Sequence, residues 1–260
     1  MTLGTLYGVG AGPGAPDLLT LRAVRILENA HVLALPRGSD YGASVAWQII
    51  EPVIGKRENQ ERLVLTFPMS KDPEQIRPYF EKAFKAVGER LERGLDVAFV
   101  TEGDPSLFST FIYLKREAAI RWPGVRVEVV PGVSSIVAVP AVTGIPLADG
   151  QERIAIVPAT YGIADLDELL AKFDTVVLMK LGGEMPHVLA ALDRANLRDR
   201  AVFVSHATMP NQRIVRDLNE LRGERGDCFA MLIVSRKERS GVLAGDTPFS
   251  APFGTTAVGS

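Results

Sequence analysis

The stretch that most constrains the fold is residues 96–111, DVAFVTEGDPSLFSTF. Its apolar run VAFV predicts a strand buried in a parallel sheet and ending at Thr101. Gly103 permits a sharp turn, and Pro105 fixes the backbone where a helix can begin. Ligands of open α/β sheets bind at the carboxyl ends of the strands, so Asp104 is the first candidate for a binding site. The alternative is that Asp104 accepts backbone N–H groups as a helix cap.

Short apolar runs alternate with amphipathic segments along the whole chain, which predicts the α/β class in both halves. A turn-rich polar connection over residues 143–153 predicts a domain boundary. We therefore expect two α/β domains, residues 1–145 and 146–239, and a weakly ordered tail over 240–260. The expected strands are 5–10, 31–35, 62–66, 97–101, 126–130, 154–158, 175–179, 201–205 and 229–234, and the expected helices are 20–29, 43–50, 73–93, 108–121, 166–173 and 185–195, with another starting near 134.

A loop rich in glycine and proline, residues 11–16, follows the first expected strand. A strand, a glycine loop and a helix suggest a dinucleotide-binding unit, whose fingerprint is G-x-G-x-x-G. Counted from Gly8, the third glycine is replaced by Pro13, and counted from Gly10 it is replaced by Ala15. The spacing therefore does not match the fingerprint.

The end of the second expected strand is a further test of dinucleotide binding. Pro36 is expected to end that strand, and Arg37 stands where a ribose-binding enzyme would carry an acidic residue. Arg37 could contact a 2′-phosphate, so an NADP-dependent oxidoreductase stays open as an alternative. A P-loop is excluded because Gly-Lys-Ser/Thr does not occur.

The charge balance gives no general attraction to nucleic acid or to an anionic membrane, since the formal net charge is −2. No run approaches the roughly 20 apolar residues of a membrane span. The single cysteine, Cys228, excludes an intramolecular disulfide framework, and the three histidines lack metal-ligand spacing. We expect a cytoplasmic protein that binds neither nucleic acid nor membrane and has no metal site.

A second polar loop, residues 131–136 (PGVSSI), follows the expected strand 126–130. It places free N–H donors and two hydroxyl groups at a strand's carboxyl end. Ser134 can cap the following helix, face a ligand, or do both.

The chain contains the segments TLYGVGAGPGAPDLLTLRAVRIL, TEGDPSLFSTF, VEVVPGVSSIVAVPAVTGIPL and SHATMPNQRIV. Together these four segments resemble the tetrapyrrole methylase family, which uses S-adenosylmethionine to methylate corrin and sirohaem precursors. The resemblance covers about residues 3 to 235, and the order and spacing of the segments make it specific. Within the family the chain is most similar to the branch that methylates the C20 meso carbon of precorrin-2 or cobalt-precorrin-2. Sirohaem-type relatives show Gly-Gly-Asp-Pro where this chain has Glu102 before a single glycine.

The resemblance implies that S-adenosylmethionine, the methyl donor, lies in a cleft between the two domains and leaves as S-adenosylhomocysteine. It also implies a carboxylate-rich tetrapyrrole substrate of cobalamin biosynthesis and a homodimer. No catalytic base is identified, although Glu102 is a candidate by position. The implied cofactor-binding residues are Pro13, Gly103, Asp104, Leu107, Ser134, Ser135, Met179 and Ala207.

Cationic side chains near expected loops are candidates for the substrate carboxylates, because a guanidinium fork suits a carboxylate. They are Arg37, Arg153, Lys180 and Arg213, and the alternative for each is a solvated surface charge. For the protein as a whole, three alternatives stay open: a methylase of the same fold that acts on diphthamide or ribosomal RNA, the NADP-dependent oxidoreductase, and a non-catalytic nucleotide-binding module.

Overall fold

The computed structural model describes residues 2–70, 72–161 and 163–237. By packing, the chain divides between Ser135 and Ile136 into two compact units, which we call unit 1 and unit 2. The boundary expected at 145/146 lies beyond the end of helix α5 (Ser135–Thr143), which falls almost wholly in unit 2. The tail expected over 240–260 lies outside the described residues.

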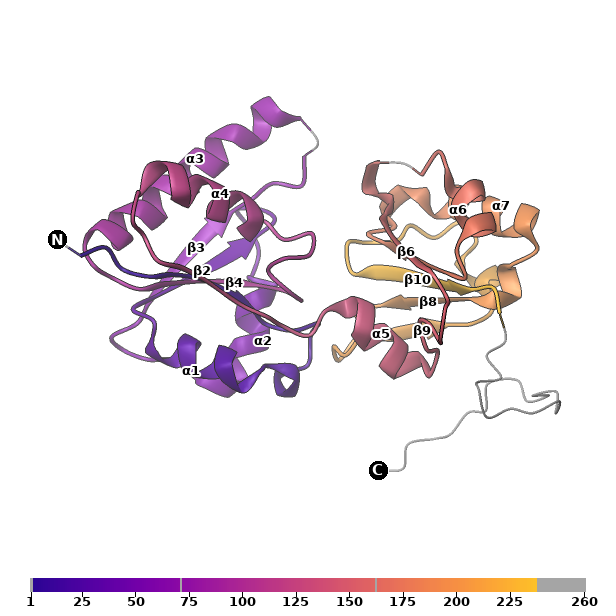
Figure 1. Ribbon diagram of the computed structural model, residues 1–260, viewed down its shortest axis with the longest axis horizontal. Coiled ribbons are helices and arrows are strands. Elements are labelled where there is room, and N and C mark those ends of the chain that lie inside the picture. Colours follow the sequence, from indigo (N-terminus) through magenta and orange to yellow (C-terminus); the bar gives the residue numbers. More distant parts are fainter. Residues whose placement is uncertain (1, 71, 162, 238–260) are drawn as a thin grey trace. The chain divides into compact units, whose positions relative to one another are not determined.

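The sheet of unit 1 has the strand order β3-β2-β4-β1-β5, and all its strands run parallel (Figure 1). Its centre is β4, whose five residues are all buried, as a continuous apolar run between two helical layers requires. The α/β class expected from the sequence is confirmed. The strands are β1 (Leu6–Gly10), β2 (Val32–Arg37), β3 (Glu61–Thr66), β4 (Val97–Thr101) and β5 (Val127–Val130).

Helices cover both faces of this sheet (Figure 1). Helices α1 (Leu21–Asn29) and α2 (Val45–Ile54) pack on one face, and α3 (Pro73–Glu92) and α4 (Phe111–Arg121) pack on the other. Each face has its own apolar core, so the sheet is sandwiched between two hydrophobic layers. Among the described helices, none is both long enough and apolar enough to cross a bilayer.

Several boundaries differ from the sequence-based expectation, and the contacts explain two of them. Strand β2 continues through Pro36, because the pairing with β4 has already ended at Ala34 and no ladder bond is lost on that side. Helix α4 begins at Phe111, three residues after Phe108, which adopts a left-handed φ of 51°. The Ser109 hydroxyl accepts a hydrogen bond from the Phe111 N–H (3.1 Å), which starts the helix there.

The sheet of unit 2 is mixed and has the order β6-β7-β10-β8-β9. Strands β6 and β7 are parallel, whereas β10 is antiparallel to both of its neighbours. The short β9 was not expected from the sequence. Helices α6 (Leu166–Lys172) and α7 (Met185–Ala195) pack against this sheet through an apolar core. The strands are β6 (Ile154–Pro158), β7 (Thr175–Met179), β8 (Ala201–Ser205), β9 (Arg213–Val215) and β10 (Ala230–Ser235). Short 3₁₀ turns in the two units lie at Pro16–Leu18, Ala159–Tyr161, Gly182–Glu184, Arg198–Arg200 and Leu218–Leu221.

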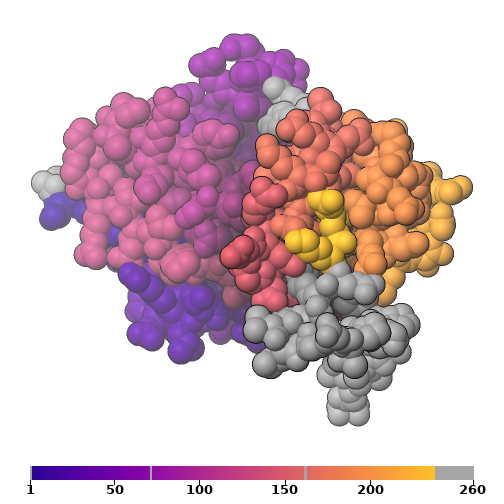
Figure 2. All heavy atoms as spheres, turned by 45° about the vertical axis from the view of Figure 1, so that its right-hand side comes forward, coloured from indigo at the N-terminus to yellow at the C-terminus, as the bar shows by residue number. Residues whose placement is uncertain are grey.

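Asp174 ties the strands of unit 2 together at the start of β7. Its carboxylate accepts a hydrogen bond from the Arg153 N–H (2.9 Å) and pairs with the Lys237 ammonium (2.8 Å), beyond the end of β10. Residues 236 and 237, which follow β10, are exposed, and this part of the chain lies at the surface (yellow atoms, Figure 2). Lys237 and then the Arg153 N–H lower the pKa of Asp174 to about 2.

We expect Asp174→Asn to lower the melting temperature at pH 7. Because the pKa is depressed in the folded state, the carboxylate stabilises the protein above its ordinary pKa, and this contribution disappears as the pH falls through about 2. The difference in melting temperature from the parent should therefore shrink below about pH 4. Thermal unfolding from pH 7 to pH 3 measures it, with Asp165→Asn as the control, and a gap that is constant over this range would contradict the assignment.

Candidate functional site

The loops after β1 and β4 meet at the carboxyl edge of the unit 1 sheet. Gly12 and Gly103 form an isolated antiparallel bridge: the Gly103 N–H donates to the Gly12 carbonyl (2.7 Å), and the Gly12 N–H donates to the Gly103 carbonyl (3.3 Å). Both glycines have positive φ, 82° and 66°, which favours glycine at these positions. Pro13 follows the bridge and is buried.

Asp104 joins this pair of loops to a third. Its Oδ1 accepts the Ser106 N–H (2.8 Å), and its Oδ2 accepts the Gly132 N–H (3.0 Å) in the loop after β5. Asp104 thus accepts backbone N–H groups, as the alternative proposed. It does not cap helix α4, however, because that helix begins only at Phe111. The carboxylate positions the loops at the strand ends.

The ends of β1, β4 and β5 approach one another so closely that Gly10 and Gly132 cannot carry a side chain. A Cβ added to Gly10 would lie 2.6 Å from both the Gly103 carbonyl oxygen and the Gly132 Cα, and one added to Gly132 would lie 2.2 Å from the Gly103 oxygen. A Cβ on Gly103 itself would meet only the Ser134 Cα, at 4.0 Å. The backbone is therefore tightly packed around Gly10 and Gly132, whereas the space next to the Gly103 Cα is open.

The remaining unit 1 residues implied by the resemblance lie in the same loops. The Leu107 N–H donates to the Asp104 carbonyl (3.2 Å), and the Leu107 side chain is half-buried. Ser134 and Ser135, which are also half-buried, lead into α5, and Glu102 is half-buried beside Gly103. The structure thus gathers Pro13, Gly103, Asp104, Leu107, Ser134 and Ser135 at one edge.

In unit 2, Met179 and Ala207 also share one sheet edge. Met179 ends β7 opposite Met231 of β10, and Met231 in turn pairs with Val204 of β8. The residues that follow β7 and β8 both bond to the backbone at the start of β10. The Lys180 N–H donates to the Ala230 carbonyl (3.1 Å), and the His206 N–H donates to the Phe229 carbonyl (3.2 Å). Ala207 is buried.

The sequence reasoning missed a group of side chains beside Ala207. The imidazole of His206 stacks on Phe229 (5.4 Å between centroids), and its Nε2 lies 3.6 Å from the Asp227 carboxylate. His206 and Thr208 both have positive φ, 51° and 67°, so the loop turns sharply on either side of Ala207. No spacing signal in the sequence links His206 to Asp227, because the pair forms only when β10 folds back antiparallel beside β8.

The arginine candidates for carboxylate binding differ in their surroundings. Arg37 ends β2 at the same sheet edge as Asp104; its Nε donates to the Thr66 hydroxyl (3.1 Å), and its Nη2 lies 3.7 Å from the Asp40 carboxylate. Arg213 is bound by Glu224 at 2.6 and 3.1 Å, which raises the pKa of the guanidinium. Its fork is therefore already filled by a carboxylate.

The other two candidates lie at opposite ends of the unit 2 strands. Lys180 follows β7 directly and so lies at the edge of Met179. Arg153 precedes β6, which is parallel to β7, so it lies at the opposite edge and donates to the Lys172 carbonyl (2.8 Å). The position of Arg153 does not support the expected role.

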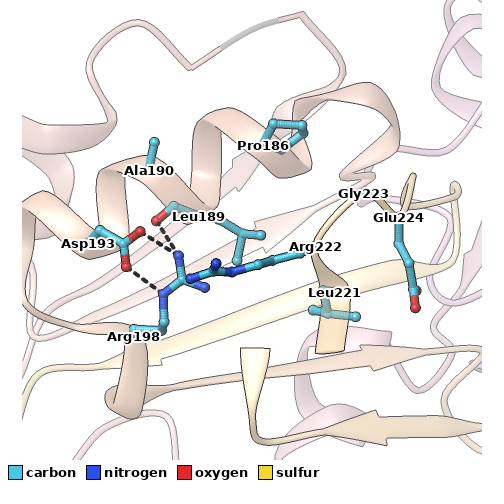
Figure 3. A pocket seen from close by; sticks show the side chains of 9 residues that line it. All are labelled: Pro186, Leu189, Ala190, Asp193, Arg198, Leu221, Arg222, Gly223 and Glu224. Atoms are coloured by element: carbon cyan, nitrogen blue, oxygen red, sulfur yellow. Dashed lines mark hydrogen bonds and ion pairs between the residues drawn. The ribbon is translucent and has the colours of Figure 1, made fainter. Parts of the chain in front are cut away.

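A pocket of about 410 Å³ lies elsewhere in unit 2, along α7, and none of the implied site residues lines it (Figure 3). Arg198 holds Asp193 through both of its Nε and Nη2 donors, and Arg222 reaches toward the same pair (Figure 3). This contact lowers the pKa of Asp193 and raises that of Arg198. The two carboxylates that line the pocket already have cationic partners, because Asp193 pairs with Arg198 and Glu224 pairs with Arg213. The pocket therefore surrounds ion pairs and offers no free carboxylate for a ligand.

Comparison with known proteins decides the family. The model of the Tetrapyrrole (Corrin/Porphyrin) Methylases matches residues 5–221, which include the strand-end loops of both units. The chain belongs to this family. The resemblance expected from the four sequence segments is thus confirmed.

Relatives in the tetrapyrrole methylase family match almost the whole chain. It is 35% identical to the cobalt-precorrin-2 C(20)-methyltransferase of Salmonella typhimurium, over 90% of this chain and 97% of the relative. It is 31% identical to a precorrin-2 C(20)-methyltransferase of Sinorhizobium, over 89% and 95%. Uroporphyrin-III C-methyl transferase of Thermus thermophilus, crystallised with S-adenyl homocysteine, superimposes with a TM-score of 0.62 at 26% identity, over 89% of this chain and 97% of that one. These relatives do not favour the NADP-dependent alternative.

Proposed function

We propose that this protein transfers a methyl group from S-adenosylmethionine to the C20 meso carbon of precorrin-2 or cobalt-precorrin-2 in cobalamin biosynthesis. The observation that carries the proposal is the match, over almost the full length of both chains, to relatives named as C20-methyltransferases. The match includes the cobalt and the cobalt-free versions, so both substrates are proposed.

We propose that the cofactor is held by the strand-end loops of each unit. In unit 1 the fit rests on the open backbone above Gly103 and on the half-buried hydroxyl residues Ser134 and Ser135. In unit 2 it rests on the half-buried Met179 and the small, buried Ala207, whose apolar surface suits a flat nucleobase. The proposed set is Pro13, Gly103, Asp104, Leu107, Ser134, Ser135, Met179 and Ala207.

The bound cofactor supplies an activated sulfonium methyl group, so the chain's own residues need to align the donor with the acceptor carbon and to exclude water. The Asp104 bonds hold the loops after β4 and β5 in fixed register for this alignment, and the Gly12–Gly103 bridge adds the loop after β1. After transfer, a base removes a proton from the methylated centre or from its conjugated system. Glu102 is a candidate for that base by its position beside Gly103.

We also propose a homodimer in the cytoplasm. The single cysteine agrees with a reducing compartment, because it can form no intramolecular disulfide. Light scattering coupled to size-exclusion chromatography tests the dimer, with a mass of one chain as the contradicting result.

The activity is tested by anaerobic incubation with S-adenosylmethionine and precorrin-2, with and without cobalt. We expect a product heavier by CH2 in the mass spectrum, since a methyl group replaces a hydrogen, and calorimetric binding of S-adenosylhomocysteine but not of NADP. Ribosomal subunits serve as the competing acceptor. Methylation of the ribosomal subunits with none of the tetrapyrrole would contradict the substrate, and binding of NADP alone would contradict the family chemistry.

A further inference from the structure

Three neighbouring loops of unit 1 expose large apolar side chains at the edge where Asp104 lies. Met69 follows β3, Tyr41 follows β2 and Phe108 follows β4, and these strands are adjacent and parallel in the order β3-β2-β4. The exposed fractions are 72% for Met69, 96% for Tyr41 and 40% for Phe108. Exposed apolar residues gathered at the ligand-binding edge of an α/β sheet indicate a binding surface.

The loop that carries Met69 is anchored. The Phe67 ring packs edge-on against Phe80 (5.0 Å between centroids) and Phe99 (6.2 Å), and the Phe67 N–H donates to the Arg37 carbonyl (2.8 Å). Phe67 packs against the core, whereas Met69, which also lies beyond the end of β3, is exposed. The fold therefore presents this side chain to solvent although burial would stabilise it.

The loop after β4 presents Phe108 in a similar way. Phe108 has a left-handed φ of 51°, an uncommon conformation for a bulky residue. Ser109, the residue after Phe108, is held in place because its hydroxyl donates a hydrogen bond to the Thr101 hydroxyl (3.0 Å). Such a conformation points to a functional constraint on where the ring lies.

Arg37 adds a cation at the base of the same surface. Its Nε is held by Thr66, whose own hydroxyl donates to Asp40 (2.8 Å), and its Nη2 lies beyond hydrogen-bond length from Asp40. By contrast, the forks of Arg121 and Arg213 each hold a carboxylate at two points. The neighbours of Arg37 thus orient its guanidinium, but none of those described here binds it through two parallel hydrogen bonds, the geometry in which arginine binds a carboxylate.

We propose that Tyr41, Met69 and Phe108 contact the face of the tetrapyrrole acceptor and that Arg37 binds one of its carboxylates. A flat conjugated macrocycle with a rim of carboxylates matches an apolar surface with a cation at its base. The aromatic rings and the adaptable thioether suit such a face. This assignment rests on the proposed function and names the part of the chain that recognises the acceptor, as distinct from the cofactor.

The test measures the KM for precorrin-2 and the Kd for S-adenosylhomocysteine in Arg37→Gln and in the double variant Tyr41→Ser/Met69→Gln. We expect each variant to raise KM about tenfold, the effect of losing a charged contact or a buried apolar contact. The Kd for S-adenosylhomocysteine should stay within about twofold of the parent value, because the cofactor loops are untouched. Leu21→Gln is the matched control, since Leu21 is equally exposed (76%) but lies on α1.

The outcomes separate the two proposals. A parent protein that methylates no tetrapyrrole overturns the proposed function and this assignment with it. An active parent whose variants keep the parent KM overturns the assignment alone, as does an equal loss of S-adenosylhomocysteine affinity. If the double variant instead converts a dimer into monomers, the surface belongs to a second copy of the chain and the assignment is wrong.

Discussion

Replacing Asp104 by alanine is expected to weaken S-adenosylhomocysteine binding at least tenfold and to destabilise the protein. The carboxylate accepts the N–H groups of Ser106 and Gly132, which belong to different loops. Removing it leaves two backbone donors without their acceptor, and each unsatisfied donor costs about 1–3 kcal/mol where it is shielded from water. The loops then lose the register on which the proposed cofactor contacts depend.

The measurements are calorimetric titration for the affinity and urea unfolding for the stability. Asp104→Asn keeps one acceptor oxygen, so it should fall between the parent and Asp104→Ala in both. Asp17→Ala, which removes an exposed carboxylate in the 3₁₀ turn before α1, is the control and should leave both values near those of the parent. An Asp104→Ala variant with parental affinity would show that Asp104 plays no part in the cofactor site.

Much of unit 1 was predictable because its inner strands β1, β2 and β4 are largely buried. Continuous apolar runs such as VAFV leave few alternatives once turn residues bound them, and β4 was expected over the residues that the structure assigns to it. The long helix α3 was equally clear, because Pro73 marks its start and its apolar residues recur every three or four positions.

Features set by tertiary pairing were not predictable. The sequence places Pro36 as a strand terminator, but only the sheet order shows that β4 no longer pairs there. The three-residue β9 carries too short a pattern to be recognised, and it exists because β8 offers it an edge. Likewise, nothing in the sequence shows that β10 lies antiparallel between β7 and β8.

The candidate site divides in the same way. The loops after β1, β4 and β5 were expected at strand ends, and the structure brings those three together. The sequence could not show that Asp104 reaches Gly132, since that contact joins loops far apart in the chain. It also could not show that Met69 and Tyr41 are exposed, because loop residues have no periodicity from which burial can be inferred.

Gly132→Ala is expected to destabilise unit 1 by about 3 kcal/mol or more. The added Cβ would lie 2.2 Å from the Gly103 carbonyl oxygen and 2.8 Å from the Gly10 Cα. Both neighbours are backbone atoms held in β-structure or in the bridge to Gly12, so no side chain can rotate away to relieve the clash. Relief requires the loops after β1, β4 and β5 to separate, which also dismantles the proposed cofactor site.

Urea unfolding checks this expectation, and two other glycines serve as controls. Gly183→Ala meets no atom within 4 Å and should change the stability by less than about 0.5 kcal/mol. Gly124→Ala also meets no atom within 4 Å, but its φ of 87° should cost about 1 kcal/mol through backbone strain. The order Gly132, Gly124, Gly183 in decreasing cost follows from the close approach of three loops, and a Gly132→Ala variant as stable as Gly183→Ala would show that the loops are not packed as described.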